Sequence, residues 1–274
     1  SRSALRRTKA DAPAMCTVIL SIAPDDPWPV VFAGNRDETR GRAARPPGRW
    51  WPDRPDVRAG FDVVAGGSWL GLNDQGVMAC VLNRAGALGP APGKRSRGEL
   101  VLEALDHADA ADAADAIADI DPAAYRPFNF VVADNRDAFW IALAGETATP
   151  RVERLPPGLS MITAHDRNSG ESHRQRRWRP VFEAAPRPTP DDGLAGWAGW
   201  TALLRGGKDV DAPPKAAMLV DAPDDFGTVS SALVALPAMG SETPPHFLFA
   251  DGPPDRAAFE PVPYDAVPSR LRIA

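Results

Sequence analysis

The chain has 274 residues, of which 44% are hydrophobic and 24% charged, and its formal net charge is −5. A chain of this size and composition buries a sizeable core without covalent staples, and its acidic balance argues against nucleic acid as a partner, since phosphate binding requires a basic surface. Its two cysteines, Cys16 and Cys80, exclude a disulfide scaffold and a structural thiolate zinc site, and we expect no metal site.

Residues 1–14 are basic and poor in large apolar side chains. We expect a disordered extension over 1–14, a single domain over 15–262 and a tail over 263–274. No signal-peptide-like apolar stretch precedes Cys16, and no apolar run approaches 18 residues. The sequence therefore favours a cytoplasmic location and predicts no membrane insertion. It indicates no particular oligomeric state.

Short apolar runs separated by turn residues predict strands along most of the chain. The predicted strands lie at 16–22, 30–36, 61–65, 68–73, 76–83, 128–134, 138–144, 159–164, 229–236 and 246–250. The run Asn73-Asp74-Gln75-Gly76 separates two of them and is typical of a hairpin turn. Cys80 lies inside an apolar run and is expected to be a core residue.

Helices are predicted between the two groups of strands. Ser96 and Glu99 have the spacing of a capping box ahead of an apolar run, which indicates a helix that begins near residue 97. Further helices are predicted at 109–120, 171–184 and 191–205, and loops at 41–58, 145–157 and 206–226. Strands near both ends with helices grouped between them favour an α+β fold, with helices layered on antiparallel sheets.

The first two predicted strands bring a thiol close to a polar run. A turn centred between residues 25 and 26 gives antiparallel partners whose numbers add up to about 51, so that Cys16 lies opposite Asn35. Three charged side chains then follow at the end of the second strand, namely Arg36, Asp37 and Glu38. The sequence leaves two simpler interpretations open: Cys16 as a small core residue, and the polar run as a surface salt-bridge cluster.

Cys16 directly follows Met15. Removal of that methionine would leave Cys16 with a free α-amine, whose ordinary pKa near 8 allows it to act as a base for the thiol. Arg36 would favour the thiolate, and Asp37 would orient Arg36 or hold the ammonium. Asn83, at the end of another strand, would donate its amide to an oxyanion. These four residues, Cys16, Arg36, Asp37 and Asn83, are the candidate catalytic residues.

Several longer motifs occur in a fixed order along the chain. They are Met15-Cys16-Thr17, Gly34-Asn35-Arg36-Asp37-Glu38, Gly66-Gly67-Ser68-Trp69-Leu70-Gly71, Leu82-Asn83-Arg84, Lys94-Arg95-Ser96-Arg97-Gly98-Glu99-Leu100, Phe128-Asn129 with Asp134, and Phe226-Gly227-Thr228 with Ser230-Ser231. With these motifs the chain resembles the NRDE family, also called the transport and Golgi organisation protein 2 family, from residue 15 to about residue 260.

The resemblance implies a four-layer αββα sandwich of the N-terminal-nucleophile (Ntn) hydrolase type, similar to bile-salt hydrolases and penicillin V acylases. In those enzymes an N-terminal cysteine, which Cys16 matches, is both nucleophile and base. Arg36 and Asp37 match their Arg/Asp pair loosely, because the order of the motif differs, and Asn83 matches their first oxyanion asparagine. This sequence departs from the pattern at Ala164, where the hydrolases place an asparagine, and at Val229, where many relatives carry arginine.

The family is linked to intracellular haem trafficking, so the resemblance implies a haem-handling protein that requires no cofactor and takes haem as its small-molecule ligand. Two alternatives stay open. One is an amidohydrolase that uses Cys16 on a linear amide or related acyl bond, and the other is a non-catalytic protein that binds an acyl lipid or acyl-CoA. Candidate ligand-binding residues are Asn35, Glu38, Trp69, His165 and Arg174. Arg174 belongs to a basic run, 174–179, whose simpler interpretation is a solvated helix face.

Overall fold

The computed structural model describes residues 16–145, 148–206, 216–222 and 225–264, and the strands in these ranges form two antiparallel sheets. The six-stranded sheet has the order β10 (Gly158–Ile162), β1 (Thr17–Ile22), β2 (Val30–Thr39), β11 (Phe226–Leu236), β12 (His246–Ala250), β13 (Glu260–Pro261). The seven-stranded sheet runs in chain order through β3 (Ala44–Gly48), β4 (Val57–Asp62), β5 (Leu70–Asn73), β6 (Met78–Asn83), β7 (Phe128–Ala133), β8 (Ala138–Leu143) and β9 (Arg151–Arg154).

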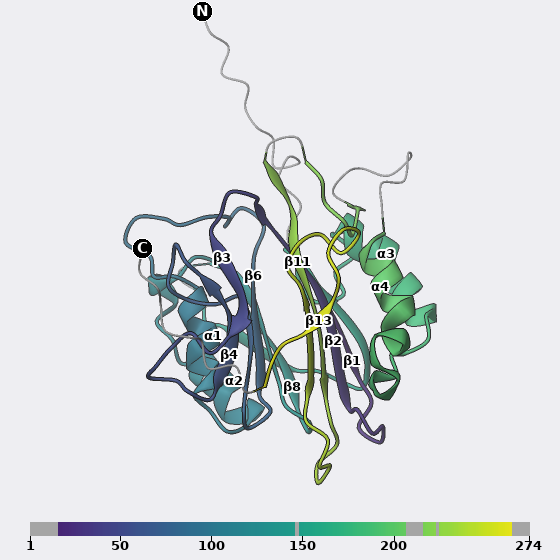
Figure 1. Cartoon of the computed structure of the whole chain (residues 1–274). Coiled ribbons are helices and arrows are strands. Elements are labelled where there is room, and N and C mark those ends of the chain that lie inside the picture. The colour runs from purple at the N-terminus through teal and green to yellow at the C-terminus, as the bar shows by residue number, and fades with distance from the viewer. Residues whose placement is uncertain (1–15, 146–147, 207–215, 223–224, 265–274) are drawn as a thin grey trace, which may run out of the picture.

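Helices cover the outer face of each sheet, and the result is the predicted αββα sandwich (Figure 1). The helices α1 (Gly98–Leu105) and α2 (Ala110–Ala118) pack on the seven-stranded sheet. The helices α3 (His173–Ala184) and α4 (Ala198–Leu204) pack on the six-stranded sheet. Among the described residues, no helix is long and apolar enough to cross a membrane.

Three apolar clusters hold the four layers together. One lies between the sheets and includes Val18, Phe32 and the predicted core residue Cys80. The second joins the seven-stranded sheet to α1 and α2, and the third joins the six-stranded sheet to α3 and α4 and includes Ile19 and Trp197. Because successive side chains of a strand point to opposite faces, β1 contributes to two clusters at once. This two-sided burial explains why its sequence is a continuous apolar run.

The predicted pairing of the first two strands is wrong by one residue. Thr17, not Cys16, lies opposite Asn35. The connection between the strands is symmetric about Asp26, whose carboxylate accepts a hydrogen bond from the backbone N–H of Trp28 at 2.8 Å. The turn is therefore centred on a residue and not between two residues. If the pairing is continued by one step, Cys16 lies beside Arg36.

Other predicted boundaries also shift. The strand predicted at 61–65 is β4, which ends at Asp62, and the loop predicted at 41–58 contains β3. Two prolines in β3 are tolerated because this strand forms the edge of its sheet. The loop predicted at 145–157 contains β9, which is the other edge strand. Most of the loop predicted at 206–226 lies outside the described residues, and β11 begins three residues before the predicted strand at 229–236.

The helix predictions are correct in place and less so in detail. The helix near residue 97 begins at Gly98 without a capping box, because Glu99 accepts a hydrogen bond from the Tyr125 hydroxyl at 2.6 Å. The helix predicted at 191–205 is a 3₁₀ helix, η3 (Pro190–Trp197), followed by α4, since Gly193 takes a positive φ of 60° that breaks the regular path. A second short 3₁₀ helix is η2 (Pro122–Ala124).

Candidate active site

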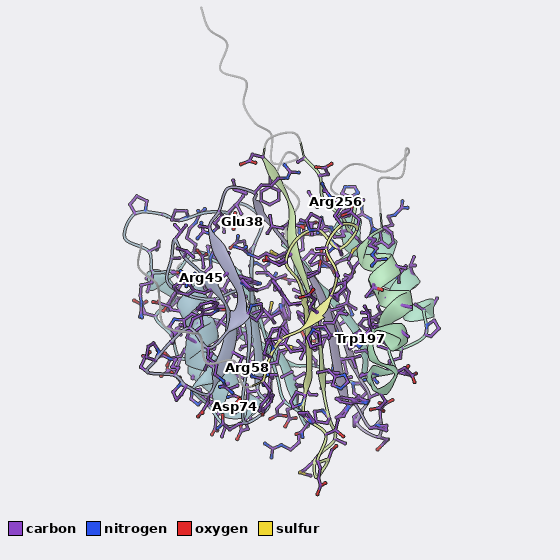
Figure 2. The ribbon with its side chains drawn as sticks, viewed as in Figure 1. Glu38, Arg45, Arg58, Asp74, Trp197 and Arg256 are labelled. Atoms are coloured by element: carbon purple, nitrogen blue, oxygen red, sulfur yellow. The ribbon has the colours of Figure 1, made fainter. Side chains whose placement is uncertain are left out.

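A cavity surrounds Cys16 at the end of the sandwich where β2 finishes, and Figure 2 shows Glu38 at this end of the molecule. One part is an apolar slot that extends between the sheets, past Phe32, Leu70 and Phe249. The other part is a wider cavity of about 340 Å³ with many polar lining residues. Half-buried Cys16 and the Trp69 side chain line both parts, so the thiol lies where the two meet.

Arg36 holds a positive charge beside this thiol. Its guanidinium carbon lies 4.2 Å from the centroid of the Trp69 ring, a cation–π arrangement that fixes its position. The nearest carboxylate is that of Glu38, with 4.0 Å between Arg36 Nη2 and Glu38 Oε2. Burial lowers the pKa of Arg36, but a guanidinium starts so high that it stays charged at neutral pH. Cys16, Arg36, Glu38 and Trp69 therefore lie together at the cavity. The sequence predicts the first three near one another and gives Trp69 only as a candidate ligand-binding residue.

The thiol itself is strongly disposed to stay neutral. Burial raises the pKa of Cys16 to about 12, and the negative charge of Asp37 adds to this effect, while Arg36 opposes it. The sulfur donates a hydrogen bond to the backbone carbonyl of Asp37, with 3.6 Å between Cys16 Sγ and the oxygen. A thiol is a poor nucleophile until it loses its proton. As long as residue 15 is attached, the cavity contains an inactive thiol.

Asp37 points to the opposite face of the sheet. Its carboxylate accepts hydrogen bonds from Thr228 Oγ1 at 2.7 Å and from Arg174 Nη1 at 2.9 Å, in a contact buried against α3. Burial raises the pKa of Asp37, and Arg174 and Thr228 oppose this. Arg174, predicted to bind ligand, therefore lies in a buried ion pair on the helix side. Its assignment to a solvated face is wrong, since the side chain is 3% exposed.

Two more predicted ligand-binding residues lie away from the cavity's polar part. The Asn35 amide donates to the carbonyls of Leu204 and Met218 at 3.0 and 2.9 Å, so it joins β2 to the helix layer. His165 follows β10 and lies 3.7 Å from Glu171 in a partly exposed loop, outside the residues that line the Cys16 cavity. No group of three or more potential metal ligands occurs within the described ranges.

Asn83 is the remaining predicted catalytic residue. It ends β6, is half-buried, and lines the wider cavity together with Cys16. Among the residues that the structure describes, its side-chain amide has no hydrogen-bond partner. An amide without an internal partner at the wall of a cavity can donate to a bound oxygen, which is what oxyanion stabilisation requires.

Ser230 lies in the slot, and the sequence analysis, which included it in a family motif, did not name it as a site residue. A β-bulge at Val229 shifts the pairing, so that Thr228 lies opposite Asp37 and Ser230 opposite Arg36. The bulge turns Thr228 and Ser230 to opposite faces, although residues two apart in a regular strand share one face. The Ser230 hydroxyl is buried, lines the slot, and has no hydrogen-bond partner among the described residues. Spacing alone could not reveal it, because the bulge breaks the alternation.

Comparison with known proteins gives a family match and three similar structures. Residues 15–179 match the model of a family described as Transport and Golgi organisation 2. No curated protein matches the sequence. A Caenorhabditis elegans N-acylethanolamine-hydrolyzing acid amidase (NAAA) ortholog is 13% identical, with 80% of this chain and 92% of that chain covered and a TM-score of 0.45.

The other two structures are a mutant and a variant of conjugated bile acid hydrolase from Clostridium perfringens. Both are 11% identical to this chain and are covered over 100% of their own length. The mutant covers 95% of this chain with a TM-score of 0.48, and the variant covers 94% with a TM-score of 0.49.

The ion pair between Asp37 and Arg174 is expected to be structural. Asp37→Ala leaves a buried guanidinium without its carboxylate, and we expect it to lower the free energy of unfolding by about 3–5 kcal/mol. Arg151→Ala, which removes an exposed pair with Asp166, is the matched control and should cost about 1 kcal/mol or less. Urea unfolding measures both. A loss for Asp37→Ala no larger than that of the control would contradict the structural role.

Ser230→Ala tests whether Ser230 contacts bound ligand or stabilises the fold. The substitution removes a buried hydroxyl that has no partner, so we expect the free energy of unfolding to stay within about 1 kcal/mol of wild type. If the hydroxyl faces bound ligand, the same substitution weakens ligand binding or turnover. Ser231→Ala is the control for stability, because the Ser231 hydroxyl donates to Asn35 Oδ1 at 2.7 Å and its removal should lower the free energy of unfolding. Destabilisation by both variants alike would contradict this assignment.

Proposed function

Because this chain belongs to the Transport and Golgi organisation 2 family, whose matched region includes Cys16 and Asn83, we propose that it is a hydrolase of linear amides or related acyl bonds with Cys16 as nucleophile. One observation carries the proposal: a half-buried thiol, a fixed guanidinium and an amide without an internal partner line the same cavity. Nucleophilic catalysis on an acyl group needs these three elements, which are a thiol, a nearby positive charge and an oxyanion donor.

The reaction begins when the chain is cut before Cys16. The freed α-amine takes the thiol proton, and the thiolate attacks the substrate carbonyl carbon to form a C–S bond. The carbonyl oxygen becomes an oxyanion, to which the Asn83 amide donates a hydrogen bond. Collapse of this intermediate breaks the C–N bond, and the ammonium of Cys16 returns the proton to the departing amine. Water then cleaves the thioester, releases a carboxylic acid and restores the thiol.

The apolar slot has a free volume of about 30 Å³, which admits the first carbons of an acyl group. Its walls include Val18, Phe32, Leu70, Ala232 and Phe249, which are buried apolar residues of both sheets. A small apolar acyl end placed there removes its own surface from water, which stabilises the complex by about 25 cal/mol per Å². Its carbonyl end would then lie at the mouth of the slot, where Cys16 is.

The state of the N-terminus should control thiol reactivity. We expect the chain that begins at Cys16 to react with iodoacetamide at pH 7.5 at least about tenfold faster than the chain that retains Met15, because only the former has an amine base. In the longer chain, the rate should rise about tenfold per pH unit towards the Cys16 pKa of about 12. Mass spectrometry of the alkylated peptide measures both rates.

Cys80 is the internal control for this experiment. It is buried, and burial raises the pKa of its thiol far above the ordinary range. Its alkylation should be slow in both chains. Equal rates at Cys16 in the two chains, or a Cys16 rate no faster than that of Cys80, would contradict the proposed nucleophile.

Haem binding is the second candidate, and one observation favours it. Cys16 lies at the entrance of an apolar slot beside the cationic Arg36, and a thiolate is one of the protein ligands of haem iron, while a guanidinium pairs with a propionate. The slot, of about 30 Å³, is smaller than a haem, so the ring would lie in the wider cavity. We expect a saturable Soret shift that Cys16→Ala abolishes. His165→Ala is the control, since His165 lies outside the cavity, and it should leave the shift unchanged. A shift that survives Cys16→Ala would contradict thiolate ligation.

A further inference from the structure

The wider part of the Cys16 cavity is basic, although the chain as a whole has a formal charge of −5. Six basic side chains line it, against two acidic ones. The basic residues are Arg36, Arg42, Lys94, Arg95, Arg97 and Arg126, and the acidic residues are Glu38 and Asp62. A concave wall with an excess of one charge raises the local concentration of ligands of the opposite charge.

The acidic residues of the cavity are paired at one side of it. Arg42 Nη2 lies 2.8 Å from Asp62, and Arg42 Nε lies 3.8 Å from Glu38. Arg95 is paired as well, with 2.6 Å between its Nε and Glu99. Arg97 and Arg126 form none of these pairs, so the carboxylates that line the cavity are bonded to other arginines.

Arg97 and Arg126 hold the loop 86–90 through carbonyl oxygens. Arg97 donates to Ala87 and Gly89, and Arg126 donates to Gly86 and to three further carbonyls of the loop. Among the described residues, neither side chain forms an ion pair with a carboxylate. Carbonyl dipoles satisfy N–H groups without removing the charge, so the two guanidiniums keep their full positive charge at the cavity wall.

The two guanidiniums are also close enough to oppose each other. Burial, and next the positive charge of Arg126, lower the pKa of Arg97 to about 10. A negative charge at Cys16 raises the pKa of Arg97, so the Arg97 guanidinium and the sulfur are close enough to interact electrostatically. An anion placed against Arg97 and Arg126 would relieve their repulsion and would use the bidentate geometry of guanidinium groups, which matches carboxylate and phosphate oxygens.

We propose that Arg97 and Arg126, with Lys94 beside them, bind an anionic group, a carboxylate or a phosphate, of the compound that Cys16 attacks. The assignment rests on the proposed nucleophile. It gives the substrate two unlike ends: a small apolar acyl end enters the slot of about 30 Å³, the scissile carbonyl lies at Cys16, and the anionic leaving part occupies the basic cavity. The thiol's location between the two parts fits such a compound better than an acyl chain with a neutral head.

Two thiol reagents of similar size test the charge of this cavity without knowledge of the substrate. In the chain that begins at Cys16, we expect anionic iodoacetate to react with Cys16 faster, relative to neutral iodoacetamide, than it does with free N-acetylcysteine. Raising the salt concentration from about 0.02 M to 0.5 M should reduce this preference, since the screening length falls well below 10 Å. A ratio equal to that of the free thiol, and insensitive to salt, would overturn the proposal.

Substitutions assign the preference to particular residues. Arg97→Gln and Arg126→Gln should each lower the ratio of the iodoacetate rate to the iodoacetamide rate about fivefold, which is the effect of about 1 kcal/mol of lost attraction. The ratio cancels any change in the thiolate population, because both reagents attack the same thiolate. Arg97→Lys keeps the charge and should retain most of the preference. Arg136→Gln is the control, because Arg136 is exposed, pairs with Asp134 and does not line the cavity. It should leave the rate ratio unchanged. Equal effects of the control and the cavity variants would overturn the assignment.

Binding of small anions separates this proposal from that of the nucleophile. Orthophosphate and acetate are titrated calorimetrically into wild type and into Arg126→Gln, whose folding is verified by its urea unfolding midpoint; if it does not fold, Lys94→Gln takes its place. Binding lost in the variant supports the anion site even if Cys16 proves inert to both reagents, which would contradict the nucleophile alone. The tighter anion identifies phosphate or carboxylate as the preferred group. Identical binding to wild type and variant would overturn the site.

Discussion

The backbone pairing of β1 with β2 is the constraint on which the site depends. With Thr17 opposite Asn35, the alternation of the strand sends Arg36 and Glu38 towards the space between the sheets and Asn35 and Asp37 towards the helices. A slip of one residue would exchange these two sets, bury Arg36 under α3 and place the Asp37 carboxylate beside the thiol. The chemistry of the cavity is therefore decided by a turn at the far end of the same hairpin.

The helix side of β2 keeps this pairing in place. Asp37 is joined to Arg174 of α3 and to Thr228 of β11, while Asn35 is joined to Ser231 of β11 and to carbonyls of the helix layer. Each of these polar groups is buried, so that a slipped register would leave it without a partner at a cost of several kcal/mol. Asn35 and Asp37 thus hold the strand in position, and Arg36 and Glu38 face the cavity.

Sequence patterns were sufficient for most strands and for the α+β class, and insufficient for the site's details. The continuous apolar runs of the central strands and the hairpin at Asn73 predicted these strands, because burial on two faces leaves a clear signal. The four-layer arrangement was implied by the family resemblance. The sequence also placed Cys16 near Arg36 and Glu38. It did not show that Asp37 points to the other face of the sheet, because that depends on a register set by the length of the connecting loop. It did not identify Ser230 as a slot residue, because a bulge turns this side chain inward. Register and bulges depend on tertiary packing, and short-range patterns carry little information about them.

The cavity leaves a thiol between two environments that affect its ionisation in opposite ways. The apolar slot disfavours a charged sulfur, whereas the basic wall of Arg36 and Arg97 stabilises it. With a peptide bond at the nitrogen of Cys16, desolvation prevails and the thiol stays protonated. A free ammonium at the same atom would add a positive charge within the shortest possible distance, together with a base whose pKa is near neutrality. Under the proposed mechanism, the balance of these contributions would make the covalent state of one nitrogen the switch between an inert buried thiol and a nucleophile.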